Sequence, residues 1–273
     1  MRRRRLLAAL LAAPALAHAQ DGAELRDAAR RAAIHLAPLY EMYVRRHRDV
    51  VERGQRLNRL SRQLAPENSV LWASAWLDLS VEPLFLTLPP MGERSYSAIL
   101  LDPFTPIFAQ ISGSTPEPQM IVGPTWKGDV PTSEVTEIRA PCRSAYLRIG
   151  IAASDDDDDL DAGRALQARL RLETPDQRNE RRIIEMRELM RQRTIPPPEP
   201  VVYWPEPRPG DPFDLFDTGL AMLAECVLSE QDRQFLDSLA PLSLRPGRKF
   251  DARAFSEAER AAIVAGIADA VKK

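Results

Sequence analysis

The sequence predicts an α+β fold: a mainly antiparallel β-sheet core flanked by N-terminal and C-terminal helices. Apolar residues recur at helical spacing up to about residue 62, short apolar runs separated by turn residues follow from 68 to 153, and helical spacing returns after Asp155. The connections between the short runs leave no room for crossover helices, so their strands are expected to pair antiparallel. The predicted strands cover residues 71–79, 84–88, 96–101, 107–111, 119–122, 135–138 and 145–152.

The length and composition are those of a soluble globular protein. The chain has 273 residues, of which 44% are hydrophobic and 28% charged, which excludes wholesale disorder and a protein with many membrane spans. The 24 prolines exceed the usual share and predict irregular connections.

The first 19 residues have the features of a secretory signal peptide. Four arginines follow Met1, Leu6–Leu16 is apolar, and Ala17-His18-Ala19 is a small-x-small cleavage site before Gln20. Because about 20 apolar residues are needed to span a bilayer as a helix, this stretch is too short for an anchor. We therefore expect cleavage between Ala19 and Gln20, a periplasmic or secreted protein, and no stable membrane insertion afterwards. The arginine run leaves both the general secretory and the twin-arginine export routes open.

The mature chain is expected to be acidic. Removing four arginines leaves 33 basic residues against 39 acidic ones, a formal net charge of −6. Nucleic acid is therefore not an expected partner, since phosphate neutralisation requires a concentrated basic face.

The mature chain is expected to contain one domain and a helical C-terminal segment. Residues 20–175 are predicted to form the domain, with a helical lead-in at 20–62, the sheet at 68–153 and a helix at 159–172. Residues 176–273 form the C-terminal segment, which contains a proline-rich connector at 195–212. Ser229 with Asp232, and Ser256 with Glu259, have the spacing of helix N-terminal caps, the second pair being a capping box.

The two cysteines allow a disulfide but do not require one. Cys142 lies in a connector and Cys226 on an apolar helix, in a compartment where bridges can form, so both a bridge and two separate thiols stay open. Zinc sites need three or four clustered ligands, and besides the cysteines the mature chain offers only His35 and His47 as soft ligands. We therefore predict no metal site and no cofactor.

The central stretch carries five blocks that occur in a fixed order. They are PENSVLWASAWLDL at 66–79, GERSYS at 92–97, LDPFT at 101–105 with Phe108-Ala109, IVGPTWKG at 121–128, and Asp159-Leu160 with Ala165-Leu166-Gln167. In this order the blocks resemble the domain of unknown function family 1254. The resemblance implies an exported bacterial protein without an established reaction, often carrying a following β-rich domain of the 1214 type. That second domain is absent here, so we expect association with a separately encoded 1214-type protein or self-association.

Several polar positions of the family pattern are replaced in this chain. Ser69-Val70 stands for an Asp-Thr pair, Ile99 for a glutamine, and Gly150 for an arginine. Each change removes a group of the kind that acid, base or oxyanion catalysis requires, which favours a non-catalytic function.

The retained polar and aromatic residues are candidates for a site, each with a structural alternative. Asp78 and Asp102 are either paired carboxylates or caps of turns at strand ends. Arg94 and Tyr96 would share a strand face, where they either hold an anionic ligand or take part in a cross-strand ion pair. Trp76 is either core or a stacking platform, and Lys127 lies in the turn 123–128, so both are further binding candidates.

Two functional classes follow. The favoured one is a non-catalytic periplasmic binding or assembly protein. The alternative is a hydrolase-like enzyme, or a subunit of one, that acts on a small or sugar-like molecule with Asp78, Arg94, Tyr96 and Asp102 in its site. Convergence of these four residues in one pocket would favour the enzyme.

Overall fold

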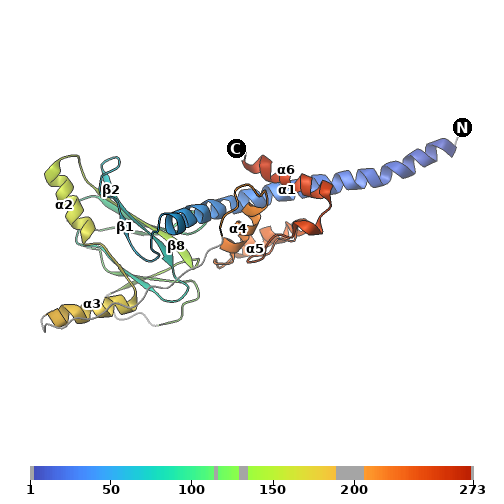
Figure 1. Cartoon of the computed structure of the whole chain (residues 1–273). Helices are drawn as coiled ribbons and strands as arrows, with labels where there is room; N and C mark the ends of the chain where they lie inside the picture. The colour runs from blue at the N-terminus through green and yellow to red at the C-terminus, as the bar shows by residue number, and fades with distance from the viewer. Residues whose placement is uncertain (1–2, 114–115, 129–134, 189–205, 272–273) are drawn as a thin grey trace. The chain divides into compact units, whose positions relative to one another are not determined.

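The computed structural model describes residues 3–113, 116–128, 135–188 and 206–271, with side chains described at 22–183 and 206–271 within these ranges. Contacts divide the chain into two compact units. Unit 1 comprises Met1–Val44, Glu206–Ala224 and Leu228–Lys273, and unit 2 comprises Arg45–Pro205 and Glu225–Val227. Helices and mainly antiparallel sheets occur together, so the predicted α+β class is confirmed (Figure 1).

Unit 2 contains a five-stranded antiparallel sheet with the order β1-β2-β8-β4-β5. The strands are β1 (Ser61–Arg62), β2 (Val70–Asp78), β8 (Ser144–Ala152), β4 (Tyr96–Leu101) and β5 (Ile107–Ile111). β2 and β8 pair along all nine residues, from Val70 opposite Ala152 to Asp78 opposite Ser144. This long pair forms the centre of the sheet.

A second sheet of unit 2 has four strands in the order β7-β6-β3-β9. They are β7 (Thr136–Arg139), β6 (Gln119–Val122), β3 (Leu84–Thr87) and β9 (Arg171–Glu173). Only β6 and β7 pair in parallel among these described strands. All seven predicted strands are therefore present, but they are distributed over two sheets.

The helix predicted at 159–172 is displaced at both ends. α2 (Asp157–Ala168) starts two residues earlier, because the side chain of Asp156 is the N-cap and accepts a hydrogen bond from the Asp159 N–H at 3.1 Å. It also ends before Arg171, since Leu172 pairs opposite Leu86 in the second sheet. The next helix is α3 (Pro175–Glu188).

One hydrophobic cluster joins the two sheets of unit 2. From the first sheet it takes Leu77 and Leu147, and from the second Leu86 and Ile121, each at most 1% exposed. Successive side chains of a strand point to opposite faces, so the residues of β2 and β8 that alternate with the core face away from it. Those residues are Trp72, Ser74, Trp76, Tyr146 and Arg148.

Unit 1 is helical. Its elements are α1 (Arg3–His47, up to Val44), α4 (Asp214–Leu223), α5 (Glu230–Asp237), α6 (Glu257–Val271) and two short 3-10 turns. α4 approaches α1 closely, because a Cβ added at Gly219 would lie 2.8 Å from Cβ of Leu36, and α6 approaches the Arg26 carbonyl at Gly266. Pro38 lies inside α1 without ending it.

Both predicted helix starts in unit 1 are confirmed, and the structure shows a capping box at the first as well as at the second. The Ser229 hydroxyl accepts from the Asp232 N–H at 3.1 Å while the Asp232 carboxylate accepts from the Ser229 N–H at 3.1 Å. Ser256 and Glu259 make the same reciprocal pair at 3.4 and 2.7 Å. Residues 195–205 of the predicted connector lie outside the described residues.

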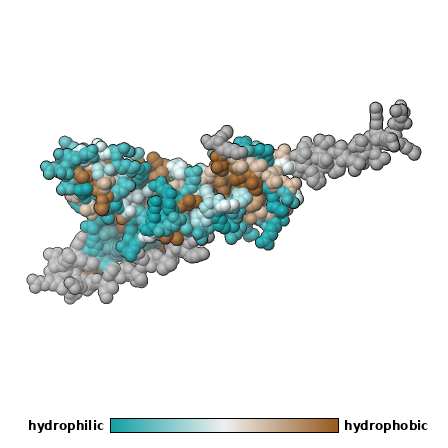
Figure 2. Space-filling model, turned by 45° about the horizontal axis from the view of Figure 1, so that its top comes forward, coloured by the Kyte–Doolittle hydropathy of each residue, from teal (hydrophilic) through white to brown (hydrophobic). Residues whose placement is uncertain are grey.

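On the face of the molecule seen in Figure 2, hydrophilic side chains cover most of the coloured surface and hydrophobic ones form smaller patches. None of the helices in the described ranges combines the length and apolarity needed to cross a membrane.

Candidate functional site: an arginine-lined cavity on the five-stranded sheet

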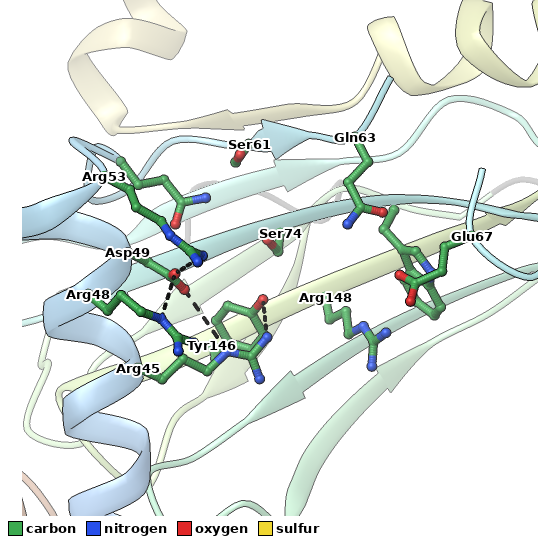
Figure 3. Close-up of a pocket in the computed structure, with 12 residues that line it drawn as sticks. Arg45, Arg48, Asp49, Arg53, Ser61, Gln63, Glu67, Ser74, Tyr146 and Arg148 are labelled. Atoms are coloured by element: carbon green, nitrogen blue, oxygen red, sulfur yellow. Dashed lines mark hydrogen bonds and ion pairs between the residues drawn. The ribbon is translucent and has the colours of Figure 1, made fainter. Parts of the chain in front are cut away.

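The face of the five-stranded sheet that points away from the core carries a cavity of about 650 Å³ (Figure 3). This is a size at which proteins hold small molecules. Its walls come from the end of α1, the π-helical turn Arg48–Glu52 that follows, and strands β1, β2 and β8. The lining residues are Arg45, Arg48, Asp49, Arg53, Gln55, Ser61, Gln63, Glu67, Trp72, Ser74, Tyr146 and Arg148.

Strand register brings the sheet residues of the cavity together. Ser61 lies opposite Ser74, and Ser74 lies opposite Arg148, so these three form one row across β1, β2 and β8. The neighbouring row pairs Trp76 with Tyr146, whose rings are 4.5 Å apart between centroids. The two-residue period of the strands therefore places hydroxyl, aromatic and guanidinium groups side by side on this face.

One wall of the cavity is an arginine cluster built around Asp49. Arg53 donates to the Asp49 carboxylate at 3.0 Å, and the Trp76 indole donates to it at 3.2 Å. Arg48 and Arg45 lie 3.9 and 4.0 Å from the same carboxylate. The contacts appear as dashed lines in Figure 3, apart from that of Trp76.

The π-helical turn supplies this arrangement. The Arg53 N–H donates to the Arg48 carbonyl at 3.0 Å, a wider turn than that of an α-helix. Such turns occur frequently at functional sites because they change the direction of side chains along a helix. Here the turn carries Asp49 and follows directly on the last turn of α1, which carries Arg45. The Arg45 guanidinium donates to the Tyr146 hydroxyl at 3.3 Å. The turn thus links the helix to the sheet face.

The opposite wall holds Arg148 stacked on an indole. Its guanidinium carbon lies 3.8 Å from the centroid of the Trp72 ring. Gly150 makes this possible, because a Cβ at position 150 would lie 2.6 Å from the Trp72 ring. Within the part of the chain that the structure describes, no hydrogen bond joins the Arg148 guanidinium to another residue. The stack holds the guanidinium group against the Trp72 ring in the wall of the cavity.

The cavity has an excess of positive charge. Four arginines face two carboxylates, Asp49 and Glu67, which gives a formal charge of +2 on a chain expected to be acidic overall. Arginine presents a planar fork of donors that matches carboxylate and phosphate groups. The arrangement can therefore bind an anion.

Asp78 and Asp102 both act as turn caps. The Asp78 carboxylate accepts from the Ser80 N–H at 3.0 Å and from its hydroxyl at 2.5 Å. Asp102 is buried after β4, where its carboxylate accepts from the Phe104 N–H at 2.7 Å. Burial raises the pKa of Asp102, and the Phe104 hydrogen bond opposes that rise.

Arg94 and Tyr96 lie at the other end of β4 from Asp102. Arg94 pairs with Asp159 at 2.6 Å and donates to the Ala152 carbonyl at 2.6 Å, while the Tyr96 hydroxyl donates to the Gly113 carbonyl at 3.0 Å. At ~3.3 Å per residue, six residues of strand separate Tyr96 from Asp102 by about 20 Å. The four residues of the enzyme hypothesis therefore do not converge in one pocket.

The other predicted site residues have separate locations. Trp76 is 3% exposed and contacts two residues that line the cavity, Asp49 through its indole N–H and Tyr146 through its ring. Lys127 is exposed in the loop after Gly123. The side chains of Ala19 and Gln20, at the expected cleavage site, lie outside the described residues. Among the described residues, no group of three His, Cys, Asp or Glu is placed to hold a metal ion.

Cys142 and Cys226, whose pairing the sequence left open, form a disulfide in the structure. The bridge lies beside a buried polar group in unit 2. Arg46, 2% exposed, pairs with Glu225 at 3.2 Å, and the Ser144 hydroxyl contacts both side chains.

Sequence reasoning missed the arginine cavity although two signals were present. Three arginines lie within four positions at a helix end, namely Arg45, Arg46 and Arg48. In a mostly buried strand, two polar side chains alternate with apolar residues, namely Tyr146 and Arg148. Such alternation indicates only that one face of the strand points away from the core. The sequence could not show that both segments meet.

Comparison with known proteins gives a family and a fold. The model of the family described as "Protein of unknown function (DUF1254)" matches residues 52–174, so the resemblance predicted from the sequence is confirmed over this range. No curated protein matches the chain significantly.

The crystal structure of the VPA0106 protein from Vibrio parahaemolyticus is similar in fold, with a TM-score of 0.69 and 20% sequence identity. The similarity covers 91% of this chain and 58% of that protein, so this chain spans less than two thirds of its length.

Proposed function

We propose that this protein, whose residues 52–174 match the DUF1254 family, is an exported, non-catalytic binding protein that holds a small organic anion in the arginine-lined cavity. The observation that carries the proposal is the cavity itself. Four guanidinium groups, two aromatic rings and several neutral hydrogen-bonding side chains surround about 650 Å³ on an otherwise open sheet face. Charge-assisted hydrogen bonds from arginine to an anion are among the strong polar contacts that proteins make.

The contacts of Asp49 support binding over catalysis by this carboxylate. A general base needs a carboxylate or imidazole with an oxygen or nitrogen available for a proton. Asp49 is surrounded by Arg53, Arg45, Arg48 and the Trp76 indole, so its oxygens are already used as acceptors. The alternative hydrolase site lacks support for a different reason, since Asp78 and Asp102 cap turns and Arg94 is paired with Asp159.

Export is part of the proposal. The basic start, the apolar stretch Leu6–Leu16 and the Ala17–Ala19 cleavage signal support a periplasmic or secreted location. A periplasmic extract containing protein that begins at Gln20 is the expected result. Protein that keeps Met1 and stays in the cytoplasm would contradict it.

Association with a 1214-type protein, or with a second copy, is proposed for the sheet edge. β5 is the last strand of the five-stranded sheet, and its Ile107 is 54% exposed. An edge strand offers unpaired backbone groups to another chain. Light scattering of the mature protein, alone and with a 1214-type domain, should show a larger species in one of the two samples.

Calorimetric titration of the mature protein with organic anions and their neutral analogues tests the binding function. We expect at least one carboxylate to bind while glucose and hexanamide do not. Replacing both Arg45 and Arg53 by alanine should lower the affinity at least tenfold, because each lost charge-assisted hydrogen bond is worth about 1.5–3 kcal/mol.

Arg30→Ala is the matched control for this test. Arg30 is an exposed arginine paired with Asp27, and it lies in unit 1. Its removal should leave the affinity unchanged. Absence of binding by every carboxylate tested, or equal loss of affinity in the control, would remove the proposed function.

A further inference from the structure

The cavity contains two cationic centres rather than one. The first consists of Arg45, Arg48 and Arg53 around Asp49, and the second is Arg148 on Trp72. Asp49 offsets one of the three arginines in the first centre, and Glu67 is a second carboxylate on the Arg148 side of the cavity (Figure 3). The lining as a whole keeps a formal charge of +2 for an incoming anionic ligand.

Strand geometry sets the spacing of the two centres. Arg45 contacts the Tyr146 hydroxyl, and Tyr146 is two residues from Arg148 on β8. Two residues of an extended strand advance by roughly 7 Å. We take this rise between Tyr146 and Arg148 as the separation of the two anionic groups in a ligand that reaches both centres.

Neutral hydrogen-bonding groups occupy the floor between the centres. Ser61 and Ser74 face each other across β1 and β2, in the same row as Arg148. Throughout the described ranges, no hydrogen bond joins either hydroxyl to another residue. A serine hydroxyl can both donate and accept a hydrogen bond, so these two side chains favour a ligand that carries hydroxyl groups over one that carries an alkyl chain.

We infer that the ligand is a hydroxylated dianion with its two acidic groups at the ends of a short chain, of which a six-carbon sugar diacid is the simplest example. Five C–C bonds of roughly 1.5 Å give an extended span of about 6 Å between its carboxyl carbons. One carboxylate lies against Arg45 and Arg53, the other against Arg148, and the hydroxyl groups face Ser61 and Ser74. This inference rests on the proposed function and names its ligand class.

Four six-carbon probes separate the two requirements. Glucarate has two carboxylates and hydroxyl groups, gluconate has one carboxylate with hydroxyl groups, adipate has two carboxylates without hydroxyl groups, and hexanoate has one without. In calorimetric titration of the mature protein, glucarate should bind at least tenfold more tightly than gluconate, because a second charge-assisted contact is made. Glucarate should also bind more tightly than adipate.

Two variants assign these differences to residues. Arg148→Ala should reduce glucarate affinity to about that of gluconate while changing gluconate affinity by no more than about twofold. Ser74→Ala should reduce the difference in affinity between glucarate and adipate. It should not change the difference in affinity between glucarate and gluconate. Arg30→Ala again serves as the control, and an unchanged far-ultraviolet circular dichroism spectrum shows that the variants are folded.

Two results would overturn the inference while leaving the proposed function intact. One is equal affinity for glucarate and gluconate in the wild-type protein. The other is an equal loss for both ligands in Arg148→Ala, which would mean that Arg148 is not a second anchor. If no carboxylate binds at all, the proposed function fails and this inference fails with it.

Discussion

The Cys142–Cys226 disulfide should contribute several kilocalories per mole to the stability of unit 2. The two residues are 84 positions apart, and the chain-entropy relation for a loop of that size gives about 4.5 kcal/mol at 25 °C. The native contacts around the bridge do not depend on sulfur. The Arg143 N–H donates to the Glu225 carbonyl at 2.8 Å, and the Val227 N–H donates to the Pro141 carbonyl at 3.0 Å. Removal of the bridge should therefore act mainly by enlarging the unfolded ensemble.

The double variant Cys142→Ala/Cys226→Ala tests this value. Alanine avoids burying a new hydroxyl at position 142, which is 1% exposed. Urea unfolding followed by tryptophan fluorescence reports on unit 2, because Trp72, Trp76 and Trp126 all lie there. With a typical dependence of ~2 kcal/mol per molar urea, the midpoint should fall by about 2 M.

Reduced wild-type protein is the matched control for the disulfide test. Treatment with a dithiol reductant should lower the midpoint nearly as far as the double variant, and thiol labelling should rise from none to two groups. A shift of the urea midpoint smaller than about 0.5 M, in protein whose thiols do not label before reduction, would refute the loop-closure reasoning.

Three further outcomes are expected. Gly266→Ala should destabilise unit 1 by about 1–3 kcal/mol, because the added Cβ meets the Arg26 carbonyl. Gly22→Ala, with open space around the added Cβ, should be neutral or stabilising, and thermal melts of both variants show whether the change in stability is negative or positive. Asp102→Asn should stabilise unit 2 at pH 7, since burial raises the pKa of Asp102 and asparagine still accepts from Phe104. This gain in urea unfolding should shrink as the pH falls through the raised folded pKa of the wild-type carboxyl, and it should be gone below the unfolded value of about 3.8. The hydrogen bond from Arg94, followed by those from Ser154, lowers the pKa of Asp159 to about 2. The stability advantage of the wild-type protein over Asp159→Asn should therefore be complete above the unfolded pKa of about 3.8 and disappear as the pH falls through 2. An advantage that does not depend on pH would contradict this.

The sequence by itself determined the fold class, the seven central strands and the starts of two helices. These features depend on local chemistry: the alternation of Trp72 and Trp76 with buried residues, and the reciprocal hydrogen bonds of Ser229 with Asp232. Local patterns also identified the family over residues 52–174. They failed at Arg171–Glu173, where pairing with β3 outweighed the helical pattern of the preceding residues.

Only the tertiary structure decided which polar residues form a site. An arginine has the same local pattern whether it ends in an ion pair, as Arg94 does with Asp159, or lines a cavity, as Arg148 does. The arginine cavity depends on contacts between the end of α1 and β8, about 100 residues apart, as in the hydrogen bond from Arg45 to Tyr146. The pairing of Cys142 with Cys226 spans a similar distance. Such contacts are set by the packing of whole elements, which no local pattern of residues contains.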